Sequence, residues 1–216
     1  MKSRRRSTLS VFASACCAIL AVVSLPNRAS SQLDEDDHRF QVTSSMFANN
    51  TTLPISAIYN FISNNVNVCS IDGSVGGNQS PELSWKNAPR RTRSFVIVAY
   101  DLTAAFTHWG MYNIPATTTE LPENAGVAGS TYGTQIYNDF PAAEYDGPCP
   151  PPNYPPDVHH YVFTVYALDT TLKLPGSPNF PPKADTLYHA LITAGEQRHI
   201  LATASITGLY STTPGT

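Results

Sequence analysis

Three β-prone runs constrain the fold of this 216-residue chain more than any other feature. Residues 94–100 (SFVIVAY) form a continuous apolar run, which is typical of a central strand covered on both faces. Residues 108–114 (HWGMYNI) and 161–168 (YVFTVYAL) are rich in aromatic side chains and are equally β-prone. Strands do not alternate regularly with helices, so a doubly wound parallel sheet is disfavoured. The sequence predicts a mainly β fold, a sandwich with a few helices.

The segments around these runs predict less regular structure. Residues 183–194 carry leucine and alanine at helical spacing and predict a helix that Gly195 ends or breaks. Residues 205–210 predict a last strand. Residues 44–80 are rich in Asn, Ser and Gly, and they predict a long excursion over the surface with one short element.

Seven prolines lie between Pro141 and Pro156, directly before the run at 161–168. Proline fixes φ and lacks the N–H that a strand ladder needs, so this segment cannot pair as a strand. Because β-prone runs flank it within one domain, it predicts a rigid loop rather than a linker. A rigid loop at a strand end is suited to form the wall of a binding site.

The N-terminus has the pattern of a secretory signal. Residues 1–6 are cationic, and residues 9–25 are apolar or small and carry no charge. The apolar stretch is short for a membrane span, which needs about 20 residues, so no transmembrane anchor is expected. The arginine cluster also fits twin-arginine export. Either route predicts a secreted or periplasmic protein.

Cleavage of the signal divides the chain and changes its charge. Small residues before Gln32 favour a cut there, which makes residues 1–31 the signal peptide; a cut after Ala29 is the alternative. Residues 32–39 then form a charged, flexible lead-in, and residues 40–216 form a single domain. The remaining chain has eight basic and 16 acidic residues, a formal charge of −8. Such a body repels phosphate backbones, which argues against nucleic acid as a partner.

Two cysteines, Cys69 and Cys149, remain after the signal is removed. In an oxidising compartment they allow one bridge, and two separate buried thiols are the alternative. A bridge would close a loop of about 80 residues and would contribute about 4 kcal/mol in the loop-entropy model. Neither cysteine has a second Cys or a His at metal-ligand spacing, so a zinc site is disfavoured.

Polar residues stand at the ends of the predicted strands. Asp101 closes the first run, His108 opens the second, and His159 and Tyr161 open the third after the proline-rich loop. If these strands are neighbours, the four side chains can share one cavity with Tyr145. Imidazoles and hydroxyls can donate to a small anion, and Asp101 would fix an imidazole in its cationic form or correct tautomer. The spacing does not support a metal ion held by these residues, and no metal or cofactor is predicted.

A series of short motifs gives the chain a family resemblance over about residues 40–210. It resembles the phosphatidylethanolamine-binding proteins, in the bacterial-type branch described as Raf kinase inhibitor-like. The motifs, in order, are 78–85 (NQSPELSW), 88–89 (AP), Asp101, 108–109 (HW), 112–115 (YNIP), 138–140 (NDF), 145–151 (YDGPCPP), 159–161 (HHY) and 166–169 (YALD).

The resemblance implies a fold, a site and a disulfide. The fold is a Greek-key sandwich of two antiparallel sheets with peripheral helices, and the site is an anion pocket for phosphate or a phospholipid headgroup. In this branch a cysteine near Cys69 commonly accompanies the one at Cys149, which favours a bridge between them. The positions that match the pocket are Asp101, His108, Tyr145, Gly147, Cys149, His159 and Tyr161.

Two parts of the chain depart from the family pattern. Residues 101–105 read DLTAA where the family usually reads Asp-Pro-Asp-Ala-Pro, so this wall of the pocket lacks a second acid and two prolines. The segments 153–158 and 60–77 make the chain longer at these places than a minimal member of the family, and 153–158 is also rich in proline.

Three functions follow from these observations. The first is an exported, non-enzymatic binding protein whose pocket takes a small anion, either a phosphate monoester or a phospholipid headgroup. The alternative, implied by the resemblance, is an inhibitor or modulator of a protease or a kinase-linked partner protein. The third is a hydrolase with His108 or His159 as base, although the chain has no Gly-x-Ser-x-Gly elbow and no phosphate loop.

Overall fold

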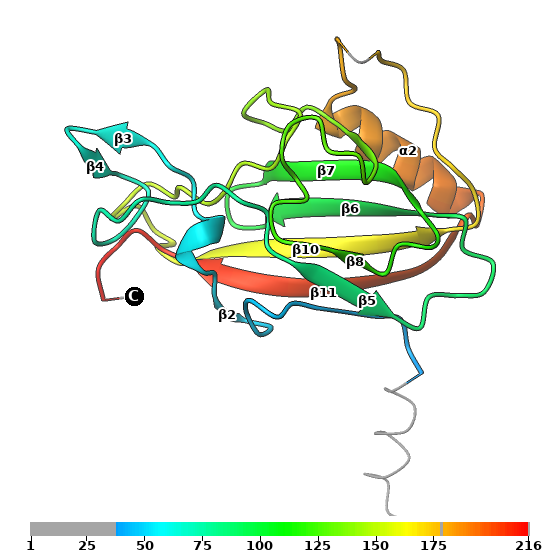
Figure 1. Ribbon diagram of the computed structural model, residues 1–216, viewed down its shortest axis with the longest axis horizontal. Helices are drawn as coiled ribbons and strands as arrows, with labels where there is room; N and C mark the ends of the chain where they lie inside the picture. The colour runs from blue at the N-terminus through cyan, green and yellow to red at the C-terminus, as the bar shows by residue number, and fades with distance from the viewer. Residues whose placement is uncertain (1–37, 178, 216) are drawn as a thin grey trace, which may run out of the picture. The chain divides into compact units, whose positions relative to one another are not determined.

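The computed structural model describes residues 38–177 and 179–215. The predicted signal peptide and residues 32–37 of the lead-in lie outside the described residues. The largest element is a six-stranded sheet in which the predicted runs lie side by side (Figure 1). Its strands, in order across the sheet, are β2 (Thr51–Thr52), β11 (Ile200–Tyr210), β10 (His159–Leu168), β6 (Ser94–Asp101), β7 (Phe106–Pro115) and β9 (Thr134–Gln135).

Smaller elements complete the fold. No helix among the described residues has the length and hydropathy to cross a membrane. A three-stranded sheet, a two-stranded hairpin, a 3-10 turn and an α-helix accompany the large sheet. They are β1 (Gln41–Thr43), β5 (Leu83–Lys86) and β8 (Glu120–Leu121) in the small sheet, β3 (Ile62–Ser63) and β4 (Val66–Asn67) in the hairpin, η1 (Ile55–Ala57) and α2 (Ala184–Glu196).

Strand β6 is covered on both faces, as its continuous apolar run predicts. Alternate side chains point to opposite faces of a sheet, so Phe95 and Ile97 join one core cluster and Val96 joins the other. The first cluster lies between the two sheets, where the Phe95 ring packs edge-on against Trp85 of β5 with centroids 5.1 Å apart. The second cluster includes Leu187 of α2. The predicted mainly β sandwich is confirmed.

The strand pairings are antiparallel except at one edge. β10 pairs with β6 and β11 over almost its full length, and β6 pairs with β7. The two residues of β2 instead run parallel to β11, with Gly208 opposite Thr51. The expected purely antiparallel sheet therefore carries one short parallel pair at its edge, where the Leu53 amide donates to the Leu209 carbonyl.

Two predicted elements are longer than their patterns indicate. The helix runs through Gly195 to Glu196, because a glycine one residue from the end costs little and the Gln197 amide still donates to the Thr193 carbonyl. The last strand begins at Ile200 rather than residue 205, because β10 offers a partner as far as Leu168.

The excursion at residues 44–80 contains more structure than the single short element predicted. It includes β2, η1 and the β3–β4 hairpin. The buried side chain of Asn67 holds it together: its Nδ2 donates to the carbonyls of Tyr59 and Ser74, and its Oδ1 accepts from the amides of Phe61 and Cys69. Such tertiary side-chain bonds leave no periodic trace in the sequence, which is why the pattern missed these elements.

Candidate functional site

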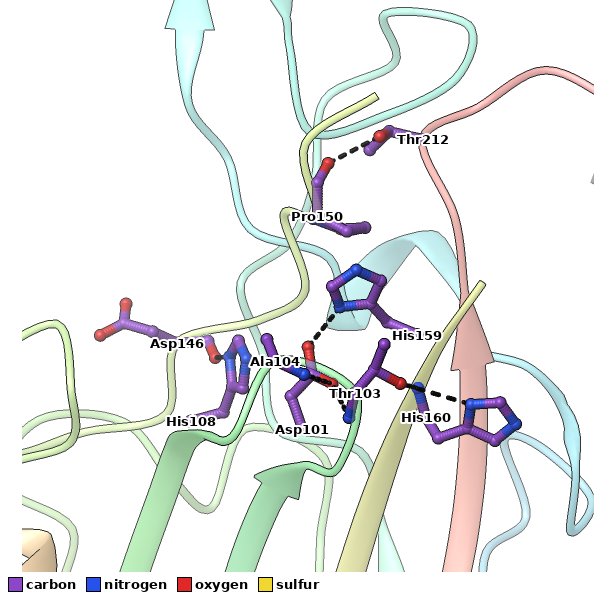
Figure 2. A network of polar contacts seen from close by, with 9 residues as sticks. All are labelled: Asp101, Thr103, Ala104, His108, Asp146, Pro150, His159, His160 and Thr212. Carbon is purple, nitrogen blue, oxygen red and sulfur yellow. Dashed lines mark hydrogen bonds and ion pairs between the residues drawn. The ribbon is translucent and has the colours of Figure 1, made fainter. Parts of the chain in front are cut away.

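The candidate site lies at the end of the large sheet where β6 finishes and where β7 and β10 begin. Asp101 is the last residue of β6, and it pairs with Tyr161 of β10 and with Phe106 at the start of β7. Because β6 is antiparallel to both neighbours, its last residues lie beside the first residues of β7 and β10. The sequence therefore folds Asp101, His108 and His159 to the same end of the sheet (Figure 2). Tyr161 lies at this end too, because it pairs with Asp101.

Asp101 and His159 form a buried pair. The Nδ1 of His159 donates to Oδ2 of Asp101 at 2.6 Å, and the other carboxylate oxygen accepts from the amides of Thr103 and Ala104 at 2.8 and 3.1 Å. Asp101 is 2% exposed and His159 is 6% exposed. The carboxylate can only accept, so Nδ1 of His159 carries a hydrogen. The exposed His160 ring lies on the other side of β10 (Figure 2).

The turn after Asp101 carries the departure from the family pattern. Ala105 has φ of +54°, in the left-handed region, which a proline at this position could not adopt. Thr103 and Ala104 turn their amides toward the Asp101 carboxylate. In this chain the Asp101 side chain is therefore fixed by the backbone of its own turn rather than by flanking prolines.

His108, the third residue of β7, is the second buried imidazole. Its Nδ1 donates to the backbone carbonyl of Asp146 at 2.7 Å. Burial lowers the pKa of His108, and the nearby carboxylates oppose this shift without cancelling it. The ring is therefore neutral at neutral pH, with its proton on Nδ1.

Tyr161 lies next to both imidazoles. Its ring packs edge-on against His108 with centroids 5.1 Å apart, and it stacks on His159 at 6.3 Å. Burial, followed by the negative charge of Asp101, raises the pKa of Tyr161. The phenol therefore keeps its proton at any physiological pH.

The other predicted pocket residues, Tyr145, Gly147 and Cys149, belong to the proline-rich loop that also carries Asp146. Tyr145 is 2% exposed, and its hydroxyl donates to the carbonyl of Ala57 at 2.9 Å. A Cβ on Gly147 would lie 2.1 Å from the same Ala57 oxygen, so only glycine allows this approach. Cys149 is bonded to Cys69 with the sulfurs 2.00 Å apart. The open choice between a bridge and two thiols is thus settled as a bridge, and it ties the excursion to the proline-rich loop.

Three further residues position His108, and their places in the sequence, away from the strand ends, did not predict this role. The carboxylate of Asp146 accepts from Nδ2 of Asn78 at 3.1 Å and from Nδ2 of Asn138 at 2.8 Å. Asn78 also accepts from the Gly147 amide at 2.7 Å. These bonds hold the Asp146 carbonyl against His108. The sequence does draw attention to these residues, because all three lie in motifs that carry the family resemblance.

The chemistry of the site depends on the two Nε2 atoms. Within residues 38–177 and 179–215, no hydrogen bond is made by Nε2 of either imidazole, and neither atom is among the fully buried unpartnered ones. Both are open to an approaching molecule. The described part of the chain brings no three His, Cys, Asp or Glu side chains together as a metal site.

Comparisons with known sequences find one family. A sequence model of the family described as phosphatidylethanolamine-binding protein matches residues 43–211. The UPF0098 protein YbcL of Escherichia coli is 36% identical over 179 residues, which cover 79% of this chain and 87% of YbcL. A UPF0098 protein of Methanothermobacter thermautotrophicus is 39% identical over 141 residues, 62% of this chain and 84% of the relative.

Comparisons with solved structures agree. The crystal structure of Escherichia coli YbcL, described as a member of the mammalian PEBP family, superposes with a TM-score of 0.64 at 34% identity, covering 80% of this chain and 98% of YbcL. A phosphatidylethanolamine-binding protein homologue of Chlamydia trachomatis superposes with a TM-score of 0.59 at 26% identity, covering 81% of this chain and 98% of the homologue.

Proposed function

Because the chain belongs to the phosphatidylethanolamine-binding protein family, we propose that it is a non-enzymatic binding protein for a small oxyanion, a phosphate monoester or a phospholipid headgroup. The ligand would bind at the end of the large sheet where β6 finishes, between His108 and His159. The observation that carries the proposal is the pair of buried imidazoles, each fixed through Nδ1 and each with a free Nε2. Each Nε2 lies on a largely buried ring, makes no hydrogen bond among the described residues and is not fully buried, so the pair is suited to contact a ligand.

The non-enzymatic part of the proposal rests on the nucleophiles near the imidazoles. Cys149 is bonded to Cys69 and cannot attack a substrate. Tyr161 keeps its proton because burial raises its pKa. The Asp101 carboxylate already accepts hydrogen bonds from His159 and from two backbone amides. These groups can bind and orient an anion, and none of them is an activated nucleophile.

Export is the second part of the proposal. Disulfides persist mainly in oxidising compartments, so the bridge between Cys69 and Cys149 supports a location outside the cytoplasm. The net charge of the exported chain is negative, so the electrostatic field of the protein as a whole does not attract an anion. Affinity then depends on the local donors of the site, and modest affinity is expected.

A calorimetric titration of the purified protein with phosphate and phosphoethanolamine tests the proposal. We expect saturable binding of both ligands. Removing the hydrogen bond from His159 to the charged ligand in His159→Ala should cost roughly 1.5–3 kcal/mol of binding free energy, which is about tenfold to hundredfold in affinity.

The matched control is His189→Ala, because His189 is an exposed residue of α2, away from the site. This variant should bind phosphate as the wild-type protein does. An absence of binding at millimolar ligand, or equal losses in the two variants, would refute the proposal.

A further inference from the structure

The two imidazoles of the site differ in what they offer a ligand. The carbonyl oxygen of Asp146 can only accept a hydrogen bond, so the Nδ1 of His108 at 2.7 Å carries the hydrogen. A neutral imidazole has one N–H. The free Nε2 of His108 therefore presents a lone pair and acts as an acceptor.

The charged groups around His108 are engaged elsewhere. Asp101 of β6 accepts from His159 and from two amides of its own turn. The Asp146 carboxylate accepts from two asparagine side chains, and Asp139 accepts from the Thr107 amide. Tyr161 of β10 faces the ring with a protonated phenol.

Two phenylalanine rings also pack near the His108 ring. Phe106 and Phe140 lie with their centroids 5.0 and 5.8 Å from it. His108 is only 5% exposed, and burial lowers its pKa despite the nearby carboxylates. Among residues 38–177 and 179–215, no carboxylate is hydrogen-bonded to the His108 ring in the way that Asp101 is bonded to His159, so the surroundings of His108 favour its neutral form.

His159 has the opposite arrangement. Its Nδ1 donates to a buried carboxylate at 2.6 Å. An anion on Nε2 completes an imidazolium with a negative group at each nitrogen, and such charge-assisted hydrogen bonds are the strong ones. His159 therefore offers a bound oxyanion a charged donor, and His108 offers the same ligand an acceptor.

We propose that this site selects oxyanions that carry a hydroxyl proton, namely phosphate and phosphate monoesters, over sulfate and over phosphodiesters. One ligand oxygen accepts from Nε2 of His159, and a protonated ligand oxygen donates to Nε2 of His108. Sulfate at neutral pH and a phosphodiester have no such proton, so they would place an oxygen lone pair against that of His108. This inference rests on the proposed function, and it favours a free monoester over the diester of an intact lipid headgroup.

Calorimetry on the wild-type protein at about pH 6, where about half of a phosphate monoester keeps its last proton, tests the selection, with phosphate, phosphoethanolamine, sulfate and glycerophosphoethanolamine as ligands. Phosphate and phosphoethanolamine should bind at least about tenfold more tightly than sulfate and the diester, the loss expected for one hydrogen bond replaced by a repulsive contact. A difference below tenfold would overturn the selection and leave the proposed function standing. No binding of any of the four ligands would overturn both.

Proton uptake provides a second readout, measured at about pH 7.5 from binding heats in two buffers of different ionisation enthalpy. A monoester loses its last proton near pH 6, whereas inorganic phosphate still has a hydroxyl at pH about 7.5. Phosphoethanolamine should therefore take up about one proton more than inorganic phosphate does. Any proton taken up by the protein itself is common to both ligands and cancels in the difference. Equal uptake would overturn the inference.

The variant His108→Gln tests which residue discriminates. The terminal amide of glutamine can turn to donate or to accept, so the preference for phosphate over sulfate should shrink to about threefold or less. The control His189→Gln, on the exposed face of α2, should keep the full preference. A preference that is unchanged in folded His108→Gln would contradict the assignment. The wild-type comparison decides the proposal even if this variant does not fold.

Discussion

Replacement of Asp101 with alanine is expected to lower the free energy of unfolding by about 3–5 kcal/mol and to abolish phosphate binding. The carboxylate is buried, and it accepts from Nδ1 of His159 and from the amides of Thr103 and Ala104. Alanine would leave all three donors without their acceptor in a site that water barely reaches. Denaturant unfolding measures the first effect, and calorimetry with phosphate measures the second.

The variant Asp101→Asn separates the two effects. Its amide oxygen can still accept from the turn, so most of the stability should remain. The negative charge that supports a cationic His159 is gone, so binding should fall as it does in the alanine variant. An alanine variant within about 1 kcal/mol of the wild-type stability would show that the pair is not a buried structural unit.

Loss of the disulfide is the other change with a large expected effect. The bridge joins residues 80 apart in the sequence. Its removal in the double variant Cys69→Ala, Cys149→Ala should lower the free energy of unfolding by about 2–5 kcal/mol, mainly because the unfolded chain is no longer closed into a loop. Denaturant unfolding of the variant and of the reduced wild-type protein measures this loss.

The bridge also affects the site. It fixes the proline-rich loop, whose Asp146 carbonyl orients His108. Phosphate binding should therefore weaken in the double variant even below its unfolding transition. If the oxidised and reduced proteins unfold at the same denaturant concentration, the bridge contributes no stability and this expectation is wrong.

The large sheet could be predicted from the sequence because its strands are long and apolar. Strand β6 is buried on both faces, so its run of Val, Ile and Phe identifies it without any partner. Strand β10 begins at His159, two residues before its apolar run, because its pairing with β11 continues past the pattern. The hairpin at 62–67 depends on Asn67, whose side-chain partners lie two to eight residues away and follow no period.

The site could be predicted only in part. Asp101, His108 and His159 stand at strand ends, and antiparallel pairing brings strand ends together. The hydroxyl of Tyr145 instead bonds the carbonyl of Ala57, 88 residues away, and no spacing in the sequence indicates that contact. The proton on Nδ1 of His108 likewise depends on a backbone carbonyl brought close by the asparagines around Asp146.

A phosphate-type oxyanion is expected to bind between Nε2 of His108 and Nε2 of His159. Nitrogen NMR spectra of the histidine side chains during a phosphate titration test it directly. We expect His108 to show the tautomer protonated on Nδ1 before ligand is added, and both Nε2 resonances to shift with one saturation curve, while the exposed His189 does not shift. A titration that leaves the Nε2 resonances of His108 and His159 unchanged would contradict the account.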